Sequence, residues 1–344
     1  MIEKGMFTSI GSWPHTDIDA ITELIINNFT CMPAWPQLPK TGFYENMYVQ
    51  YSQAFPCIVI DDKNEKIYFD TSGDVFSAIQ TVYEHYLSQD YDYFAISQEY
   101  AKGLYSFRSK LRNKAKLPMI KGQALGPVSF GLTLTDENKR LIIYDEQMQD
   151  ALVKACVCKA VWQARFLKPL ADKIVIFIDE PYLVSFGSAY INVSRQQIID
   201  MINEVIDSLR AEDVFTGIHC CGSTDWSIVI DTNVDILNFD AYNYSESIMI
   251  YPEKINEFLI KGNYIAWGIV PTAEDKIDSE TPDSLLSRLT GQQKKLISLG
   301  VDKTNLLKRA VFTPSCGTGS LSERSAERAI ELLKGVSLLY REKY

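Results

Sequence analysis

The chain has 344 residues, and its 34 Lys and Arg against 44 Asp and Glu give a formal charge of −10. This excess of acid repels the phosphates of nucleic acid and of anionic lipid, so we expect neither nucleic acid nor a membrane as a partner. With 46% hydrophobic residues, the composition is that of a globular protein with ample material for a core. The N-terminal residues lack the apolar stretch of a signal peptide, which predicts a cytoplasmic location.

One rhythm recurs along the chain, in which a short apolar run is followed by a loop and then by a helical pattern. Parallel strands joined by helical crossovers produce this rhythm. Most of the runs are too apolar and too β-branched for a half-exposed antiparallel sheet. The eight predicted strands are Met6–Ile10, Thr30–Ala34, Pro118–Ala124, Ile174–Ile178, Val214–Ile218, Asp235–Phe239, Tyr264–Gly268 and Ala310–Thr313.

Between the strands, apolar residues recur at three- and four-residue spacing and predict amphipathic helices. The first helix is expected to follow a Thr16 cap. Residues 55–115 depart from the rhythm, because Cys57–Asp61 and Lys66–Phe69 flank a polar turn and predict a β-hairpin followed by helical segments. The predicted helices are Asp17–Asn28, Glu146–Phe166, Ser194–Arg210, Thr281–Leu299 and Ser322–Leu339.

Eight strand–helix units predict an α/β fold, a single (β/α)₈ TIM barrel that spans residues 1–344 as one catalytic domain. Residues 55–115 form an excursion from the second unit. The alternative is an open doubly wound sheet, but no Gly-rich phosphate-binding motif follows any predicted strand. In a barrel, functional side chains lie in the loops that follow the strands, so we sought candidates there.

The sharpest candidate is His219-Cys220-Cys221, which follows the fifth predicted strand, Val214–Ile218. Alternate side chains of a strand point to the same side, so His219 and Cys221 face together while Cys220 faces away. An imidazole and a thiolate are two ligands of a tetrahedral zinc site, and Cys316, after the last strand, is a candidate third ligand. Asp240, after the next strand, is a candidate oxygen ligand. The alternative is that these cysteines pack as small hydrophobic residues.

Two adjacent carboxylates, Asp179 and Glu180, directly follow a buried apolar strand, where an unpaired carboxylate is unfavourable. One interpretation is that they bind the amino group of a substrate or relay a proton. The other is that one of them caps the next helix while its neighbour faces solvent. Ser12 and the backbone around Gly11 are candidates for binding a carboxylate, with a plain turn as the alternative.

Together these motifs resemble the cobalamin-independent methionine synthase family, within the grouping shared with uroporphyrinogen decarboxylase. The matching pieces follow the family's order over nearly the whole chain. They are Ser9–His15 (SIGSWPH), Gly122–Pro127 (GQALGP), Ile178–Pro181 (IDEP), His219–Cys221 (HCC), Trp267–Thr272 (WGIVPT) and Pro314–Gly317 (PSCG). The resemblance implies a TIM barrel and a role in methionine biosynthesis.

The resemblance also implies a set of metal ligands. The family binds Zn²⁺ through a His-x-Cys motif, a C-terminal cysteine and a glutamate, and these positions match His219, Cys221 and Cys316. The glutamate position falls on Asp240, whose side chain is one methylene shorter. The resemblance therefore implies a zinc cofactor held by at least three side chains of this chain.

For the substrates, the resemblance implies that Ile10 and Ser12 bind the carboxylate of an amino-acid thiol and that Asp179 binds its amino group. The reaction implied is methyl transfer to homocysteine or a related thiol. The chain has one barrel where full-length family members have two, so it resembles the stand-alone core members. For these, a methylcorrinoid protein is an expected methyl donor beside methylfolate.

Two other functions remain open from the sequence. A metal-free decarboxylase of the uroporphyrinogen type shares the barrel, but it needs an N-terminal arginine-rich loop, and the first 50 residues contain no arginine. A non-catalytic protein that binds a corrinoid or another methyl carrier is the second alternative. It predicts little zinc and no methyl transfer to any thiol.

Overall fold

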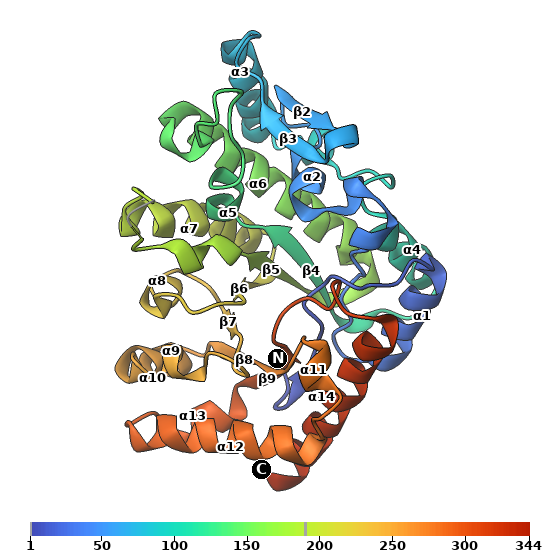
Figure 1. Ribbon diagram of the computed structural model, residues 1–344, viewed down its shortest axis with the longest axis vertical. Helices are drawn as coiled ribbons and strands as arrows, with labels where there is room; N and C mark the ends of the chain where they lie inside the picture. Colours follow the sequence, from blue (N-terminus) through green and yellow to red (C-terminus); the bar gives the residue numbers. More distant parts are fainter. Residues whose placement is uncertain (1, 189–190) are drawn as a thin grey trace.

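The computed structural model describes residues 2–188 and 191–344. Its centre is a curled sheet of seven parallel strands in the order β1-β9-β8-β7-β6-β5-β4 (Figure 1). The strands are β1 Met6–Phe7, β4 Leu117–Leu125, β5 Ala171–Asp179, β6 Val214–Cys220, β7 Ile236–Phe239, β8 Tyr264–Val270 and β9 Ala310–Pro314. The predicted barrel-type α/β fold is confirmed, with seven of the eight predicted strands present among the described residues.

The remaining predicted strand, Thr30–Ala34, is wrong as a strand, yet residues 30–37 close the ring. It makes single parallel bridges to both neighbours, from Ala34 to Lys121 of β4 and from Gln37 to Ser12 after β1. Three prolines fall within residues 33–39. Because proline lacks the amide hydrogen that a ladder needs, this stretch bridges its neighbours at isolated points instead of forming a strand.

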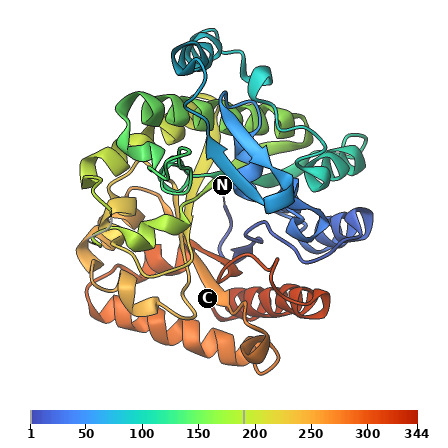
Figure 2. The same ribbon diagram turned by 45° about the horizontal axis from the view of Figure 1, so that its top comes forward.

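Helices lie around the outside of the curled sheet (Figure 2). The five predicted helices are present, with ends that differ from the prediction by at most four residues. The first is capped by Asp17 instead of Thr16, because the Asp17 side chain accepts the first free amides. The five are α1 Ile18–Asn28, α6 Glu146–Leu167, α7 Arg195–Ala211, α12 Pro282–Ser298 and α14 Glu323–Lys343.

Shorter helices complete the crossovers and the excursion. They are α2 Met47–Ser52, α3 Val75–Leu87, α4 Lys102–Leu111, α5 Pro127–Gly131, α8 Trp226–Ile230, α9 Ser245–Ile248, α10 Pro252–Ile260, α11 Glu274–Ile277 and α13 Lys303–Lys308. Within the described ranges, none of the helices combines the length and the apolar character that crossing a bilayer requires.

The predicted hairpin is also present. Strands β2 Ile58–Asp61 and β3 Lys66–Phe69 pair antiparallel and form a separate two-stranded sheet. Figure 1 shows the hairpin with α2 and α3 at one end of the molecule, beyond α5 and α6. The excursion is therefore an addition to one side of the ring, and it leaves the order of the parallel strands unchanged.

An apolar layer fills the inside of the ring, as is usual for barrels of this kind. A second, larger cluster packs between the strands and the helices. The inner side chains come from strands all around the ring and from the segments beside them: Ile2, Met6, Met32, Met119, Val175, Phe177, Ile236, Tyr264, Ala266 and Val311. Polar side chains that point inward near the strand ends therefore pack against an apolar layer inside the ring.

Candidate metal centre and active site

The strand register points a row of polar side chains into the mouth of the barrel. Phe177 of β5 belongs to the inner apolar cluster, so Asp179, two residues further on, also faces inward. Asp179 pairs with His219 of β6, and His219 pairs with Asn238 of β7. Residues paired across parallel strands face the same side, so all three polar side chains lie at the carboxyl ends of adjacent strands and point inward.

His219, Cys221 and Cys316 meet at this rim. One ligand atom from each of the three lies within 4.8 Å of the other two. The first two come from the end of β6 and the third follows β9, so the fold joins residues almost one hundred positions apart. Cys220 faces the opposite way and is part of the outer core cluster, as the alternation of side chains predicts. Three of the four predicted ligands are therefore neighbours in space.

Asn238 fixes the orientation of the His219 ring. Its amide nitrogen donates to the carbonyl of Ala266 and to the hydroxyl of Thr313, both at 2.9 Å. The amide oxygen of Asn238 is thus left to accept from Nδ1 of His219, at 2.6 Å. In the neutral ring the proton therefore sits on Nδ1, and Nε2 carries the lone pair. Among the described residues this buried Nε2 has no hydrogen-bond partner.

The three groups also act on one another electrostatically. The thiol of Cys316 and the imidazole of His219 lower the pKa of Cys221 to about 4. The interaction of Cys316 with Cys221, together with burial, raises the pKa of Cys316. Burial lowers the pKa of His219, but the neighbouring Cys221 and the charge of Asp179 outweigh it and leave that pKa raised. One thiolate is thus stabilised beside an imidazole and a second thiol, a donor set that suits a divalent cation.

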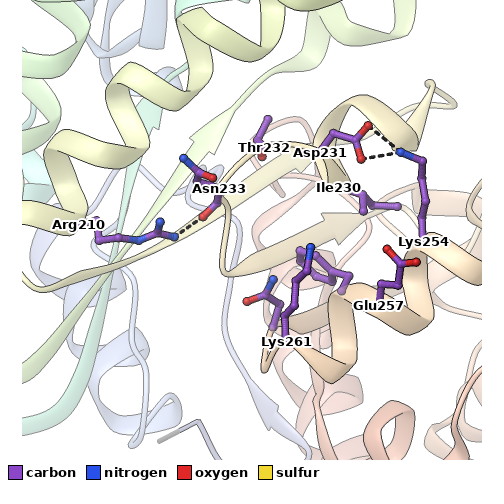
Figure 3. A pocket seen from close by; sticks show the side chains of 10 residues that line it. Arg210, Ile230, Asp231, Thr232, Asn233, Lys254, Glu257 and Lys261 are labelled. Carbon is purple, nitrogen blue, oxygen red and sulfur yellow. Dashed lines mark hydrogen bonds and ion pairs between the residues drawn. The ribbon is translucent and has the colours of Figure 1, made fainter.

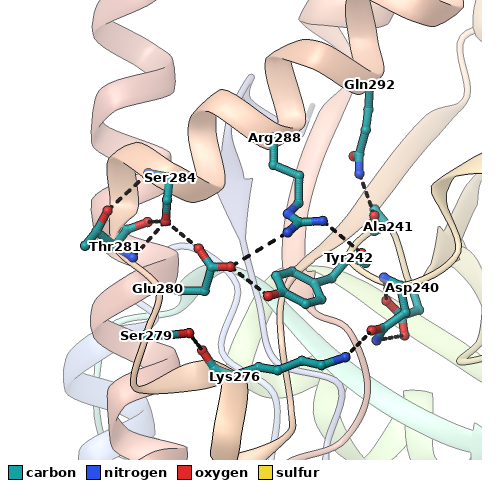
Figure 4. Close-up of polar contacts among 11 residues, drawn as sticks. Asp240, Ala241, Tyr242, Lys276, Ser279, Glu280, Thr281, Ser284, Arg288 and Gln292 are labelled. Carbon is teal, nitrogen blue, oxygen red and sulfur yellow. Dashed lines mark hydrogen bonds and ion pairs between the residues drawn. The ribbon is translucent and has the colours of Figure 1, made fainter.

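Asp240, the fourth predicted ligand, lies outside this group of three, although the charges of Cys221 and His219 act on it. Its two carboxylate oxygens accept from the backbone amide and the side-chain amide of Asn243, at 2.8 and 2.7 Å. The loop is braced further by Lys276, which donates to Asn243, and by Gln292, which donates to the carbonyl of Ala241 (Figure 4). The short Asp side chain folds onto its own turn. In this structure Asp240 anchors the loop after β7 and does not complete the cluster.

Asp179 presents an unused acceptor to the same mouth. Its Oδ1 is buried and has no hydrogen-bond partner within the described part of the chain. Burial raises the pKa of Asp179 to about 6, and the nearby positive groups of His219 and Lys121 oppose that rise. A buried carboxylate oxygen without a donor is unfavourable, so this position suits a ligand that carries a hydrogen-bond donor.

Glu180, the next residue, does not fit the expectation that it binds substrate. It is fully buried, and its oxygens accept from the backbone amides of Val128 and Ser129 at 3.0 and 2.7 Å. The hydroxyl of Ser129 donates to it as well, at 2.6 Å. These groups belong to the first turn of α5, so Glu180 caps that helix. The helix that Glu180 caps precedes the acidic pair in sequence, so the expected capping of the next helix is not what the structure shows.

The loop after β1, with Ile10 and Ser12, lies against the loop that carries Cys316. The carbonyl of Ser12 accepts from the amide and the hydroxyl of Thr318, at 3.0 and 2.8 Å. A Cβ on Gly317 would lie only 2.1 Å from the Ser12 hydroxyl oxygen, so the two loops approach each other closely here. The predicted carboxylate-binding loop is thus a neighbour of the His/Cys cluster.

Two polar residues of the barrel interior escaped the sequence analysis. Asn238 interrupts the apolar strand β7, and Lys121 lies in the middle of β4, where it is fully buried. Each carries a signal that could have revealed it, namely a polar side chain at an inward position of an otherwise apolar strand. Both lie within strands, whereas the functional side chains of a barrel are expected in the loops that follow the strands.

A separate pocket of about 430 Å³ lies at the opposite end of the sheet (Figure 3). Its lining residues Asn233 and Asn263 precede β7 and β8, which places it at the amino ends of the strands. Lys254 and Asp231 form an ion pair there at 2.6 Å. This pocket is remote from the His/Cys cluster, which lies at the carboxyl ends of the strands.

No protein-family model matches the sequence, and no curated protein matches it. Among solved structures, a B12-independent methionine synthase from Shewanella sp. W3-18-1, in complex with selenomethionine, has a similar fold. It has a TM-score of 0.63 at 15% identity, over 99% of this chain and 98% of that one. A putative vitamin-B12-independent methionine synthase from Listeria monocytogenes has a TM-score of 0.55 at 13% identity, over 96% and 86% of the two chains. These likenesses confirm, at the level of the fold, the resemblance carried by the strand-end motifs.

Proposed function

We propose that this protein is a zinc-dependent methyltransferase that transfers a methyl group to a thiol, with residues 1–344 acting as one catalytic domain. The observation that carries the proposal is the meeting of His219, Cys221 and Cys316 at the carboxyl-end rim of the barrel. Nitrogen and thiolate ligands suit zinc, and the unpartnered Nε2 of His219 provides a free lone pair. The other ring nitrogen of His219, Nδ1, is hydrogen-bonded to Asn238, and metal-binding histidines usually make such a hydrogen bond.

The fold comparison supports the reaction class. The similar proteins are described as methionine synthases, and the Shewanella structure holds selenomethionine, an amino acid with a methyl group on selenium. When bound, zinc would keep the acceptor sulfur ionised at neutral pH, where a free thiol of pKa about 8.5 is only a few per cent thiolate. We therefore propose homocysteine or a related thiol as acceptor.

The chain's own residues would orient that acceptor. Asp179 offers its unpartnered oxygen to the ammonium group, and the backbone between Ile10 and Ser12 lies close enough to the cluster to receive the carboxylate. The acceptor sulfur supplies the electron pair of the new S–CH₃ bond. The donor, a methylcorrinoid (free or on a protein) or methylfolate, loses the methyl group as its Co–C or N–C bond breaks, and the bond pair stays on the donor.

Metal analysis tests the ligand assignment. After incubation with zinc and removal of the excess, we expect about one zinc per wild-type chain and a large loss in Cys316→Ser. Cys220→Ser is the matched control, because Cys220 is adjacent to the cluster in sequence but faces the outer core. Asp240→Asn should also keep the metal, since Asn243 occupies both oxygens of Asp240. Equal zinc in the wild type and in Cys316→Ser, or none in either, would refute the assignment.

Activity is tested with the zinc-loaded enzyme and a panel of thiols that includes homocysteine, coenzyme M and methanethiol. Methylcobalamin serves as a generic donor, beside methylfolate. The expected result is an S-methyl product from at least one thiol, detected by mass spectrometry. A zinc-loaded protein that methylates no thiol from either donor would contradict the proposal and favour a non-catalytic methyl-carrier-binding protein.

A further inference from the structure

Lys121 is a buried cation inside the barrel. Its register partner on β5 is Val175, a member of the inner apolar cluster, so the lysine side chain enters the ring from β4. Its Nζ donates to the carbonyl of Ile10 at 2.5 Å and lies 4.6 Å from the centre of the Phe177 ring. A fully buried ammonium group is unfavourable unless its surroundings compensate it, so this side chain requires an explanation.

The surroundings provide two compensations, and both belong to the proposed acceptor site. The first is the Ile10 carbonyl, at the start of the loop assigned to the acceptor carboxylate. The second is the charge of Asp179, assigned to the acceptor ammonium, which opposes the fall in the pKa of Lys121 to about 8 caused by burial. Lys121 therefore interacts with the loop assigned to the acceptor carboxylate, through Ile10, and with the residue assigned to the acceptor ammonium, Asp179. It is not a member of the His/Cys cluster.

The backbone between Ile10 and Ser12 is held at both ends. Thr318 donates to the Ser12 carbonyl from the loop after β9, and Lys121 donates to the Ile10 carbonyl from inside the ring. Without the ammonium group, the Ile10 carbonyl would be left buried without its charged donor. The end of the loop nearest the barrel interior would then lose one of its fixed points, while the Gly11 carbonyl would still accept from the Gln37 amide at 3.0 Å.

We propose that Lys121 is a positioning residue that holds the Ile10–Ser12 loop in the conformation that binds the acceptor carboxylate and places a positive charge beneath Asp179. The inference rests on the proposed function, because it assigns Lys121 to the orientation of an amino-acid acceptor. It predicts that loss of the ammonium group weakens acceptor binding much more than it slows the transfer step.

The test compares Lys121→Met with Lys159→Met. Lys159, on α6, is also fully buried and also donates to backbone carbonyls, those of Gln53 and Phe94 in the excursion. Both variants lose a buried ammonium group, so their stabilities should fall comparably. Only Lys121→Met should raise the KM for the acceptor, by about tenfold or more, with kcat within about threefold of the wild type. Zinc content should be unchanged in both.

Amide hydrogen exchange supplies a second readout that does not depend on activity. The amide of Trp13, next to the loop, donates to the Gln37 carbonyl at 2.8 Å. Its exchange should be about tenfold faster in Lys121→Met and unchanged in Lys159→Met. If the wild type transfers no methyl group, the proposed function fails, and the exchange at Trp13 alone decides on Lys121.

The proposal is overturned if Lys121→Met keeps both the acceptor KM and the Trp13 exchange of the wild type. It is also overturned if Lys159→Met changes them as much, because the effect would then follow from loss of stability alone. Should Lys121→Met fail to accumulate as folded protein, Lys121→Gln, which retains a polar end, replaces it with the same expected rise in KM.

Discussion

The amide of Asn238 decides which nitrogen of His219 is free. Because its NH₂ group is committed to Ala266 and Thr313, only its oxygen remains for the His219 ring. A wrongly oriented or wrongly protonated imidazole would offer the metal an N–H in place of a lone pair. The geometry of the cluster therefore depends on a residue that contributes no ligand atom.

Replacing Asn238 with leucine tests this dependence, since leucine has a similar size but makes no hydrogen bond to the ring. We expect zinc affinity to fall by about ten- to a hundredfold, as measured by competition with a chromophoric chelator. Asn243→Ala is the control, because Asn243 supports Asp240, outside the cluster, and should leave the affinity unchanged. Wild-type affinity in Asn238→Leu would show that the ring is held by other means.

Sequence reasoning at this scale succeeded where periodicity alone decides the outcome. The alternation of side chains along a strand places His219 and Cys221 together and turns Cys220 away, and the structure agrees. It did not predict the hydrogen bonds of Asp240, because the choice between an open site and the Asn243 turn depends on local contacts that no spacing rule contains. The acidic pair was undecidable for the same reason, since the capping role of Glu180 depends on where α5 begins.

Among the elements, the segment that closes the ring depends on a close approach of helix α4. A Cβ on Gly103, in the first turn of α4, would lie 1.8 Å from the carbonyl oxygen of Pro36. A backbone atom cannot give way as a side chain can, so only glycine fits between the helix and the closing segment. This contact positions the segment that bridges β1 to β4.

Gly103→Ala is therefore expected to lower the free energy of unfolding by about 1–3 kcal/mol through overpacking. Gly291, inside α12, has no atom within 4 Å of the place where its Cβ would lie. Gly291→Ala should consequently raise stability by about 0.5–1 kcal/mol, through helix propensity alone. Urea unfolding of the two variants makes the comparison. A Gly103→Ala protein as stable as the wild type would mean that α4 does not depend on this approach.

The elements that the sequence predicted well are those whose residues agree with their environment. Strands such as Ile174–Ile178 are apolar and β-branched because both faces are buried, and the pattern shows that directly. The prediction for Thr30–Ala34 was wrong because the segment is largely apolar like a strand, while the prolines within it and after it remove the amides needed for a ladder. Closure of a ring is a property of two distant neighbours, β1 and β4, which no local window contains.

For the molecule as a whole, buried carboxylates link stability to pH in an unusual direction. Glu45 is fully buried and accepts from the backbone amides of Lys102 and Leu38, at 2.7 and 3.4 Å. Burial nevertheless raises its pKa to about 7, against an ordinary value of 4.5. Burial raises the pKa of Glu180 to about 7 as well. Both groups hold a proton more tightly in the folded state than in the unfolded chain.

A raised carboxyl pKa gives stability that is fully present below pH 4.5 and is lost as the pH rises through about 7. The difference between 7 and 4.5 corresponds to at most about 3 kcal/mol for Glu45. Glu45→Gln, which keeps an acceptor for the Lys102 amide, should therefore lose less stability than the wild type between about pH 5 and pH 8. Urea unfolding of the metal-free proteins in that range measures the slopes.

Glu99→Gln is the control for this experiment, because Glu99 is exposed and its replacement should leave the slope of stability against pH as it is. Carboxylates near the surface such as Asp70 and Asp74, whose pKa values are lowered by hydrogen bonds to serines, act in the opposite direction. Only the difference between variant and wild type is therefore informative. Identical slopes in Glu45→Gln and the wild type would mean that Glu45 does not hold a proton in the folded state. The pH dependence would then have to come from the carboxylates at the mouth of the barrel, where Asp179 also has a raised pKa.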